Sequence, residues 1–373
     1  MIEKKRPAHS PRQEHSVPWF WPFAAAIELQ DEGLQLYRKN LDFLAEAGEL
    51  VAPPESQWAT PNRVLLDLDT MRLREFGARE GLPVLIDAPY AGHSSTIVDY
   101  AGDRSLVATL RNSGVERVLA TDWKSATAAM RDYDIDKYLA ELNVAVDEAG
   151  GIVLLVGLCQ GGWMSAMYAA RFPDKVRALV LAGAPMDTDA GEGAIKKIAH
   201  SLPMSFYEEL VELGSGRMLG RTMLAGWKSM HPEQQYVDKF IDLYEHIEDK
   251  CYIERTEQFE RWYENPIDLP GRYYLQAIEL LFKENQLAKR QFVALGRPVD
   301  LRAIRVPLSL LAGAQDDITT KEQVFNAAAL VGTPSEDIVE KLVPGGHIGL
   351  FMGARTLTGP WRDIGRWLVA QCR

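Results

Sequence analysis

The sequence of 373 residues has little cysteine, no long apolar run and no excess of positive charge. Its three cysteines, Cys159, Cys251 and Cys372, are an odd number spread along the chain, so no disulfide framework is predicted and we expect a cytoplasmic protein. No apolar run approaches the ~20 residues that a transmembrane helix needs, so no transmembrane segment is predicted. The formal net charge of −11 argues against nucleic acid as a partner, because phosphate binding requires a surplus of Lys and Arg.

Two kinds of cofactor site are also missing from the sequence. The seven histidines show no metal-ligand spacing, and no glycine-rich phosphate loop follows the first predicted strand. We therefore expect neither a metal nor another cofactor. Charged residues make up 25% and apolar residues 47% of the chain, which is typical of a folded globular protein with a sizeable core.

The first 60 residues are predicted to form a polar tail followed by an amphipathic helix. Between Pro18 and Glu49, leucines recur at near-helical spacing. An aromatic cluster opens this segment: Trp19, Phe20, Trp21 and Phe23. Such aromatic residues favour interfaces between apolar and aqueous phases. The segment either packs on the rest of the chain, as apolar stripes usually do, or attaches the protein to an insoluble surface.

Residues 61–373 show the pattern of an α/β protein, because short apolar runs alternate with amphipathic helical stretches. This alternation is typical of a mostly parallel sheet that is covered on both faces. The predicted strands are Pro83–Ile86, Arg117–Thr121, Ile152–Gly157, Ala178–Ala182, Pro307–Ala312 and Ile338–Leu342. Helices are predicted between them, as at Ile135–Ala149 and Gly161–Arg171. The alternation stops between about residues 187 and 299, where an aromatic-rich helical insertion is predicted to form a lid.

The segment IVLLVGLCQGGW at residues 152–163 carries the strongest functional signal. A buried strand leads into a G-x-C-x-G turn centred on Cys159, and a helical pattern begins directly after it. This is the strand–turn–helix context of the nucleophile elbow of the α/β-hydrolase fold, with Cys in place of Ser. The elbow strains the backbone and tolerates only small neighbours, which Gly157 and Gly161 supply. A buried structural cysteine is the alternative interpretation.

Two further strand ends supply the partners that a nucleophilic cysteine needs. Asp316 and Asp317 follow the predicted strand Pro307–Ala312, and His347 follows the next one within a glycine-framed loop. The order nucleophile, acid, histidine is that of the catalytic triad of this fold. The usual strand-end pattern, Asp then any residue then an apolar residue, favours Asp316. A loop that is shorter by one residue favours Asp317 instead.

An oxyanion hole requires two backbone N–H donors near the nucleophile. Gln160 directly follows Cys159 and supplies one of them. The loop after the strand Pro83–Ile86 supplies the other from Tyr90 or Ala91, because Pro89 has no N–H.

Two residues are assigned to substrate binding. His93 lies in the loop that follows the strand Pro83–Ile86, where it either contacts substrate or caps a helix that begins near Ser94. Trp163 lies on the helix that begins at the elbow.

The sequence at these positions resembles the polyhydroxyalkanoate synthases and the intracellular polyhydroxyalkanoate depolymerases, from about residue 80 to the C-terminus. GLCQGG at 157–162 is similar to the elbow of both groups. FPDKVRALVLAGAPMDT at 172–188 and ENQLAKRQFVALGRPVDLRAIRVPL at 284–308 are similar to synthase segments. APYAGHSST at 88–96 and GHIGLFMG at 346–353 resemble the depolymerases instead.

The resemblance implies that Cys159 carries a hydroxyacyl group and that His347 acts as general base with Asp316 or Asp317 as its partner. The favoured function is a depolymerase-like hydrolase of poly-3-hydroxybutyrate or related esters. The alternative is a synthase-like acyltransferase that uses (R)-3-hydroxyacyl-CoA. The intact triad argues against a third hypothesis, a non-catalytic granule-binding protein. A polyester or hydroxyacyl substrate and a granule surface are the expected partners, and a homodimer is compatible with the sequence.

Overall fold

The computed structural model describes residues 55–78, 80–230 and 250–372. The predicted helix between Pro18 and Glu49 lies outside these ranges, so the expectation of surface attachment stays a prediction. Three aromatic residues of the predicted insertion also lie outside them: Tyr236, Phe240 and Tyr244.

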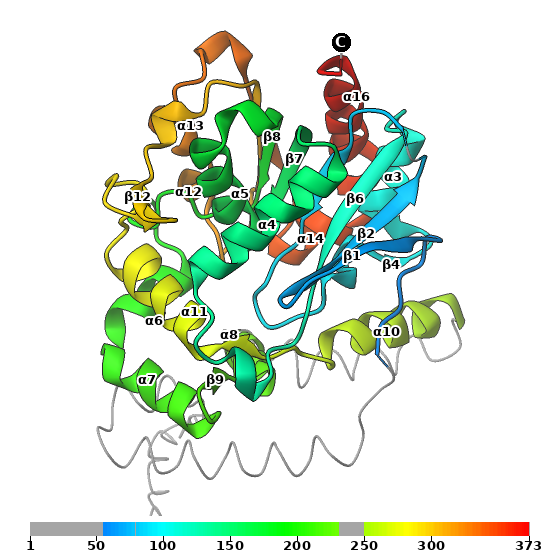
Figure 1. Cartoon of the computed structure of the whole chain (residues 1–373). Coiled ribbons are helices and arrows are strands. Elements are labelled where there is room, and N and C mark those ends of the chain that lie inside the picture. Colours follow the sequence, from blue (N-terminus) through cyan, green and yellow to red (C-terminus); the bar gives the residue numbers. More distant parts are fainter. Residues whose placement is uncertain (1–54, 79, 231–249, 373) are drawn as a thin grey trace, which may run out of the picture.

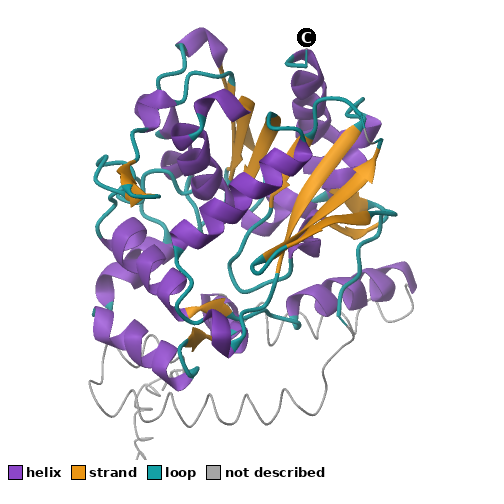
Figure 2. Cartoon of the chain, viewed as in Figure 1, coloured by secondary structure: helices purple, strands orange, loops and turns teal. Residues whose placement is uncertain are grey.

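One large sheet organises the described chain (Figure 2). Its strands are β1 (Arg63–Asp67), β2 (Met71–Gly77), β3 (Val84–Asp87), β6 (Arg117–Trp123), β7 (Val153–Leu158), β8 (Val176–Ala182), β13 (Leu308–Gly313) and β14 (Ile338–Val343). The spatial order is β1-β2-β6-β3-β7-β8-β13-β14. From β6 to β14 all neighbours pair in parallel, and β2 is antiparallel to both β1 and β6. The six predicted strands are confirmed, with ends that differ by at most two residues.

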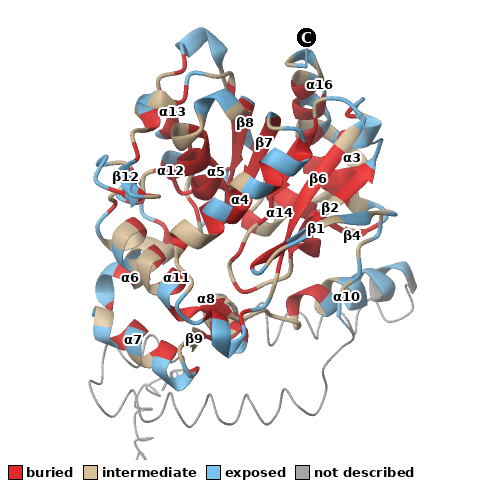
Figure 3. Cartoon of the chain, in the orientation of Figure 1, coloured by how far each residue is buried: buried red, intermediate tan, exposed pale blue. Residues whose placement is uncertain are grey.

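Burial on both faces explains why the inner strands are continuous apolar runs. Every residue of β3, β7 and β13 is buried, and the helices that follow them lie on the two faces of the sheet (Figure 3). Helices α3 (Leu106–Asn112) and α16 (Arg362–Ala370) pack together on one face, and α4 (Ile135–Ala149) and α5 (Gln160–Arg171) pack together on the other (Figure 1). The predicted α/β-hydrolase architecture is therefore confirmed.

Helix α4 shows why the sequence predicted some elements to the residue. Asp134 is its N-cap, and the carboxylate accepts a hydrogen bond of 3.1 Å from the N–H of Lys137. Gly150 ends the helix at a φ of 120°, a conformation that favours glycine. Both signals are visible in the sequence, and α4 has the predicted bounds.

The described part of the segment between β8 and β13 is mostly helical. It contains α6 (Ala194–Ser201), α7 (Met204–Leu213), α8 (Gly220–Met230), α10 (Lys250–Tyr263), α11 (Gly271–Gln276) and the π-helix η5 (Ala277–Lys283). Two short ribbons also lie there: β9 (Arg217–Met218) with β10 (Leu269–Pro270), and β11 (Val293–Ala294) with β12 (Arg297–Pro298). Helices α6, α7, α8, α10 and α11 gather at one end of the sheet (Figure 1).

The remaining elements are short. They are η1 (Ser95–Val98), β4 (Asp99–Ala101), β5 (Arg104–Ser105), η2 (Ala128–Met130), η3 (Pro173–Lys175), η6 (Leu301–Ala303), α12 (Lys321–Phe325), α13 (Ala327–Leu330), η7 (Ser335–Asp337), α14 (His347–Met352), α15 (Ala354–Thr356) and the π-helix η8 (Leu357–Trp361). Within the ranges that the structure describes, no helix has both the length and the apolar character that crossing a bilayer demands.

Candidate active site

Cys159 occupies a strained turn between β7 and α5. Its φ of 50° and ψ of −115° lie in a region that residues with a side chain rarely adopt. The turn has no room for side chains on its glycines. A Cβ on Gly161 would lie 2.1 Å from the carbonyl oxygen of Asp87, and one on Gly162 would lie 2.3 Å from the Cβ of Ala184. The steric requirement predicted from the G-x-C-x-G turn is therefore present in the structure.

His347 begins α14, directly after the loop that follows β14. Its Nδ1 lies 2.8 Å from Oδ2 of Asp316, which follows β13. The other carboxylate oxygen of Asp316 accepts hydrogen bonds from the N–H groups of Ile318 (3.1 Å) and Thr319 (2.9 Å). These bonds fix the carboxylate, and the carboxylate in turn fixes the imidazole.

The two candidate aspartates lie in different environments. Asp316 is buried, whereas Asp317 is exposed and its backbone carbonyl accepts a hydrogen bond of 2.9 Å from Ala194 of α6. Of the two, the structure brings Asp316 into contact with His347. This is the residue that the strand-end spacing favoured.

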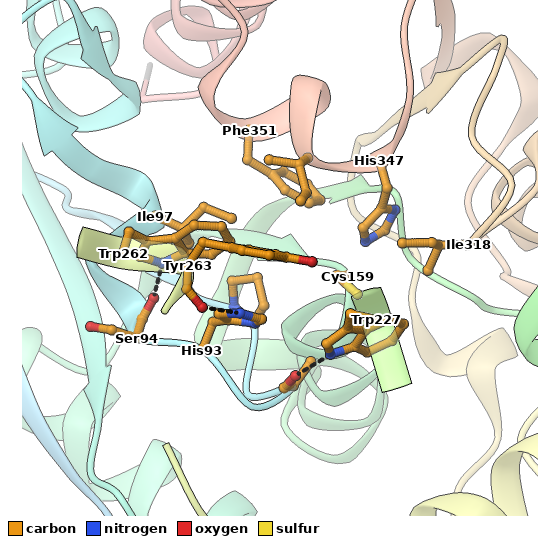
Figure 4. A pocket seen from close by; sticks show the side chains of 13 residues that line it. His93, Ser94, Ile97, Cys159, Trp227, Trp262, Tyr263, Ile318, His347 and Phe351 are labelled. Atoms are coloured by element: carbon orange, nitrogen blue, oxygen red, sulfur yellow. Dashed lines mark hydrogen bonds between the residues drawn. The ribbon is translucent and has the colours of Figure 1, made fainter. Parts of the chain in front are cut away.

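The imidazole of His347 points towards the sulfur of Cys159 (Figure 4). Burial alone would lower the pKa of His347. Electrostatic interactions with Asp316 and Cys159, together with hydrogen bonds to both, outweigh burial and raise the pKa of His347 well above its ordinary value. The arrangement places the imidazole between an acid and a sulfur, which suits proton transfer to and from a reacting group.

Two pockets open on Cys159, and most of their lining is apolar. The first, which we call the histidine pocket, is bordered by His93 and His347 together with Ile97, Trp262, Tyr263 and Phe351. The second, which we call the methionine pocket, is bordered by Met218 and Met223 together with Ile195, Ile198, Tyr207 and Phe282. Both pockets share Ala91, Cys159, Trp227 and Ile318. The loop after β3, helix α8 and the loop after β13 thus meet at the sulfur of Cys159.

The residues expected to form the oxyanion hole occupy different positions. Gln160 borders the methionine pocket, and Ala91 borders both pockets. Tyr90 is buried and borders neither of them. Its hydroxyl lies 3.0 Å from that of Tyr138 and donates to the carbonyl of Lys124 over 3.1 Å. The side chain of Tyr90 therefore anchors the loop, while Ala91 lies next to the site.

His93 stands at the wall of the histidine pocket. Its Nε2 lies 3.1 Å from the carbonyl oxygen of Tyr263, and its ring stacks on Trp262 and Tyr263 with centroids 4.7 and 5.1 Å away. Of the two alternatives for His93, helix capping is wrong, because Ser94 caps η1 by accepting from the N–H of Thr96. His93 instead joins the loop after β3 to α10.

The assignment of Trp163 to substrate binding is corrected. Trp163 is 1% exposed, borders neither pocket, and packs against Tyr273 with ring centroids 6.1 Å apart. It lies one helical turn beyond Cys159 on α5, where its ring packs against Tyr273 of α11 and not against a pocket. The sequence contained no signal that separates this position from one facing the pocket.

Several residues of the site were not singled out by the sequence. Ile318 directly follows the Asp316-Asp317 pair, and Met218 and Met223 come from the insertion. Trp227 belonged to a long series of aromatics in the insertion, and nothing in that series distinguished it. Among the described residues, no group of three or more His, Cys, Asp or Glu side chains is placed to hold a metal ion.

Solved structures of the same fold include two with a TM-score of 0.52. One is the monoacylglycerol lipase of Paleococcus ferrophilus, which is 18% identical and aligned over 81% of this chain and 99% of its own. The other is a carboxylesterase structure from the thaumarchaeon Nitrososphaera gargenis, which is 15% identical and aligned over 83% of this chain and 99% of its own. At these identities the likeness establishes the α/β-hydrolase fold.

Curated relatives include proteins named poly(3-hydroxyalkanoate) polymerase subunit PhaC. The one from Haloferax mediterranei is 28% identical over 365 residues, which is 93% of this chain and 72% of that protein. The one from Allochromatium vinosum is 28% identical over 332 residues, which is 85% of this chain and 88% of that protein. The resemblance to polyhydroxyalkanoate synthases is confirmed by these relatives. A family match over residues 79–343, most of the chain, shows that the protein belongs to the family described as "Protein of unknown function (DUF3141)".

Proposed function

We propose that this protein is an acyltransferase of the poly(3-hydroxyalkanoate) polymerase type, with Cys159, His347 and Asp316 as its catalytic triad. The arrangement of Cys159 on its strained turn, facing a histidine held by a buried aspartate, carries the proposal. The relatives named as polymerases support transfer, the alternative in the sequence analysis, over the hydrolase that was favoured there. An insoluble polyester product makes a granule surface the proposed partner.

The first half-reaction transfers the acyl group from a thioester to the enzyme. The thiol of Cys159 gives its proton to His347, and its sulfur attacks the carbonyl carbon of a 3-hydroxyacyl-CoA, so a C–S bond forms and the carbonyl π electrons move to its oxygen. The tetrahedral intermediate collapses, the bond to the coenzyme A sulfur breaks, and the leaving thiolate takes a proton from His347. The products are hydroxyacyl-Cys159 and free coenzyme A.

The second half-reaction transfers the acyl group to a hydroxyl. The terminal hydroxyl of a growing chain gives its proton to His347 while its oxygen attacks the acyl carbon. The new ester C–O bond forms, the C–S bond breaks, and Cys159 leaves as a thiolate beside the protonated imidazole. Asp316 holds the ring orientation and stabilises its positive charge in both steps.

The negative oxygen of each intermediate requires hydrogen-bond donors. We assign this role to the backbone N–H groups of Gln160 and of the Tyr90–Ala91 stretch, with Ala91 favoured because it borders both pockets. Residues 61–373 would then form the hydrolase domain, with a lid at about 187–299. Trp227, Trp262 and Tyr207 of that segment border the pockets and would exclude water, so an alcohol rather than water would attack.

The test offers the purified protein 3-hydroxybutyryl-CoA and, separately, amorphous polymer. Transfer predicts release of coenzyme A with growth of polymer, whereas release of hydroxy acid from polymer would support the hydrolase instead. Cys159→Ala should reduce turnover by several orders of magnitude, as loss of a triad nucleophile does. Cys251→Ala removes the exposed thiol of α10 and serves as the control. More than about a tenth of wild-type activity in Cys159→Ala would contradict the nucleophile assignment.

A further inference from the structure

Trp227 of α8 stands where the two pockets meet at Cys159. Its indole N–H donates a hydrogen bond of 3.2 Å to the carbonyl oxygen of Ala91, which ties the ring to the loop after β3 (Figure 4). Ile318 borders both pockets from the other strand end. The sulfur therefore faces two separate apolar spaces, and Trp227 and Ile318 form part of the wall of each.

Size alone does not tell which pocket holds which part of the substrate, because the cavity volumes are about 150 Å³ for the histidine pocket and 110 Å³ for the methionine pocket. Their polar groups do differ. The proton-transferring residue His347 borders only the histidine pocket, and Gln160 borders only the methionine pocket. The two sides of the sulfur are therefore chemically distinct.

Acyl transfer requires His347 and Gln160 to act on different atoms of the substrate, so their placement in different pockets orients the acyl group. A leaving or attacking atom exchanges its proton with His347, so it must reach the acyl carbon from the histidine pocket. The oxygen of the acyl group must point towards the N–H of Gln160 if the proposed oxyanion hole is correct. The acyl chain then continues away from His347, on the side of Gln160.

We propose that the methionine pocket holds the acyl chain of the acyl-Cys159 intermediate and that the histidine pocket receives the leaving thiol and then the attacking hydroxyl. This inference rests on the proposed function and adds to it the subsites of the reaction. Trp227 is the positioning residue that keeps the two groups apart.

The lining of the methionine pocket also indicates the chemical class of the acyl chain. Its polar side chains near the sulfur are Gln160 and Thr319, while the hydroxyl of Tyr207 already donates to the carbonyl of Ile198 over 3.1 Å. Oε1 of Gln160 is buried, and the structure gives it no hydrogen-bond partner. A hydroxyl near the acyl carbonyl, which both donates and accepts, can pair with the Gln160 amide in either orientation.

Further from the sulfur the pocket is apolar, with Ile195, Ile198, Met218, Met223 and Phe282 in its wall. Such a wall binds a hydrocarbon tail, since each buried CH₂ contributes about 0.8 kcal/mol. The acyl group that fits is therefore a 3-hydroxyacyl chain, and an alkyl tail beyond the hydroxyl should strengthen its binding.

A matched pair of truncations tests the assignment. Ile198→Ala enlarges the methionine pocket and Ile97→Ala enlarges the histidine pocket by the same atoms. The substrates are p-nitrophenyl 3-hydroxybutanoate and p-nitrophenyl 3-hydroxyoctanoate, and the rate of nitrophenol release during acylation is measured. Ile198→Ala should change the ratio of kcat/KM for the two chain lengths about tenfold, in the range that one to a few methylenes contribute in an apolar pocket. Ile97→Ala should leave that ratio within twofold.

The second half-reaction provides the converse readout. With 3-hydroxybutyryl-Cys159 preformed, the partition between methanol and 1-butanol as acceptors should shift in Ile97→Ala and stay constant in Ile198→Ala. If Ile198→Ala fails to fold, Ile195→Ala on the same helix makes the same test. A chain-length change in Ile97→Ala alone would overturn the assignment.

The same substrates separate this inference from the proposed function. A wild-type protein that is acylated by the nitrophenyl esters but not by 3-hydroxybutyryl-CoA would contradict the proposed transferase function. The chain-length test with the nitrophenyl esters would still decide the assignment of the two pockets. Trp227→Ala should join the pockets and shift both the chain-length ratio and the partition between methanol and 1-butanol. Trp227→Phe should keep both values close to those of the wild type. Unchanged selectivity in Trp227→Ala would contradict the role of Trp227 as the separating residue.

Discussion

Asp316 and Asp317 are neighbours in the sequence but have different surroundings in the fold. Asp316 is buried against His347, and Asp317 is exposed on the outer side of the loop. If the triad is correct, Asp316→Asn should lower turnover by about 10⁴-fold, because the amide favours the wrong imidazole tautomer. Asp317→Asn should stay within severalfold of wild type. Steady-state kinetics with one activated ester compares the two, and an inactive Asp317→Asn beside an active Asp316→Asn would reverse the assignment.

His93 is a second residue whose protonation can be followed. Burial is the largest cause that lowers its pKa to about 4, with Lys228 acting in the same direction and the hydrogen bond to the Tyr263 carbonyl opposing them. The ordinary value is 6.5, so between pH 6.5 and 4 the unfolded chain binds a proton that folded His93 does not. The free energy of unfolding should therefore fall as the pH decreases through this window, by about 2 kcal/mol at pH 5.

The substitution His93→Gln removes this titration and keeps a hydrogen-bond donor for the Tyr263 carbonyl. Denaturant unfolding at pH 7 and pH 5 measures the effect. The loss of stability between the two pH values should be smaller in His93→Gln than in the wild type by about 2 kcal/mol. Equal pH dependence in His93→Gln and wild type would show that the His93 ring is solvated.

At the scale of elements, the turn between β7 and α5 is the most constrained part of the site. Gly161→Ala would place a Cβ 2.1 Å from the carbonyl oxygen of Asp87, at the end of β3. The Cβ is fixed to the backbone of α5 and the oxygen belongs to the backbone of β3, so neither atom can move away alone. We therefore expect the free energy of unfolding to fall by about 1 to 3 kcal/mol or more, with a lower melting temperature. Gly102→Ala, where a Cβ meets no atom within 4 Å, should change stability by less than about 0.5 kcal/mol. Similar melting temperatures for the two variants would contradict the close approach.

The same element shows how far sequence reasoning reaches. Five of the predicted strands are apolar runs that the structure buries almost entirely, and α4 and the turn at Cys159 carry a cap, a terminal glycine and small residues at fixed spacing. The sixth strand, β14, contains Glu340 and Lys341 and is only partly buried. The antiparallel strands β1 and β2 were not predicted. In β2 only one face is fully buried and charged residues such as Arg72 and Arg74 alternate with apolar ones, so the strand lacks the continuous run on which the prediction relied.

The pockets could not be predicted for a different reason. Trp163 and Trp227 are both large aromatic residues in helical segments, and only tertiary packing places one in the core and the other beside the sulfur. Local sequence predicts the three residues of the proposed triad because each of them follows a strand. It does not identify a pocket wall, which forms where the insertion, the loop after β3 and α14 meet.

At the scale of the whole molecule, net charge opposes the proposed substrate. The chain carries a formal charge of −11, and coenzyme A carries phosphates, so long-range repulsion should slow their encounter at low salt. Raising the ionic strength from 0.01 to 0.15 M shortens the screening length from about 30 Å to about 8 Å. The rate of Cys159 acylation by 3-hydroxybutyryl-CoA should therefore rise severalfold over this range. The uncharged p-nitrophenyl 3-hydroxybutanoate is the control, and its rate should stay within twofold. A coenzyme A rate that falls with salt would show that basic side chains near the pockets attract the phosphates and dominate over the net charge.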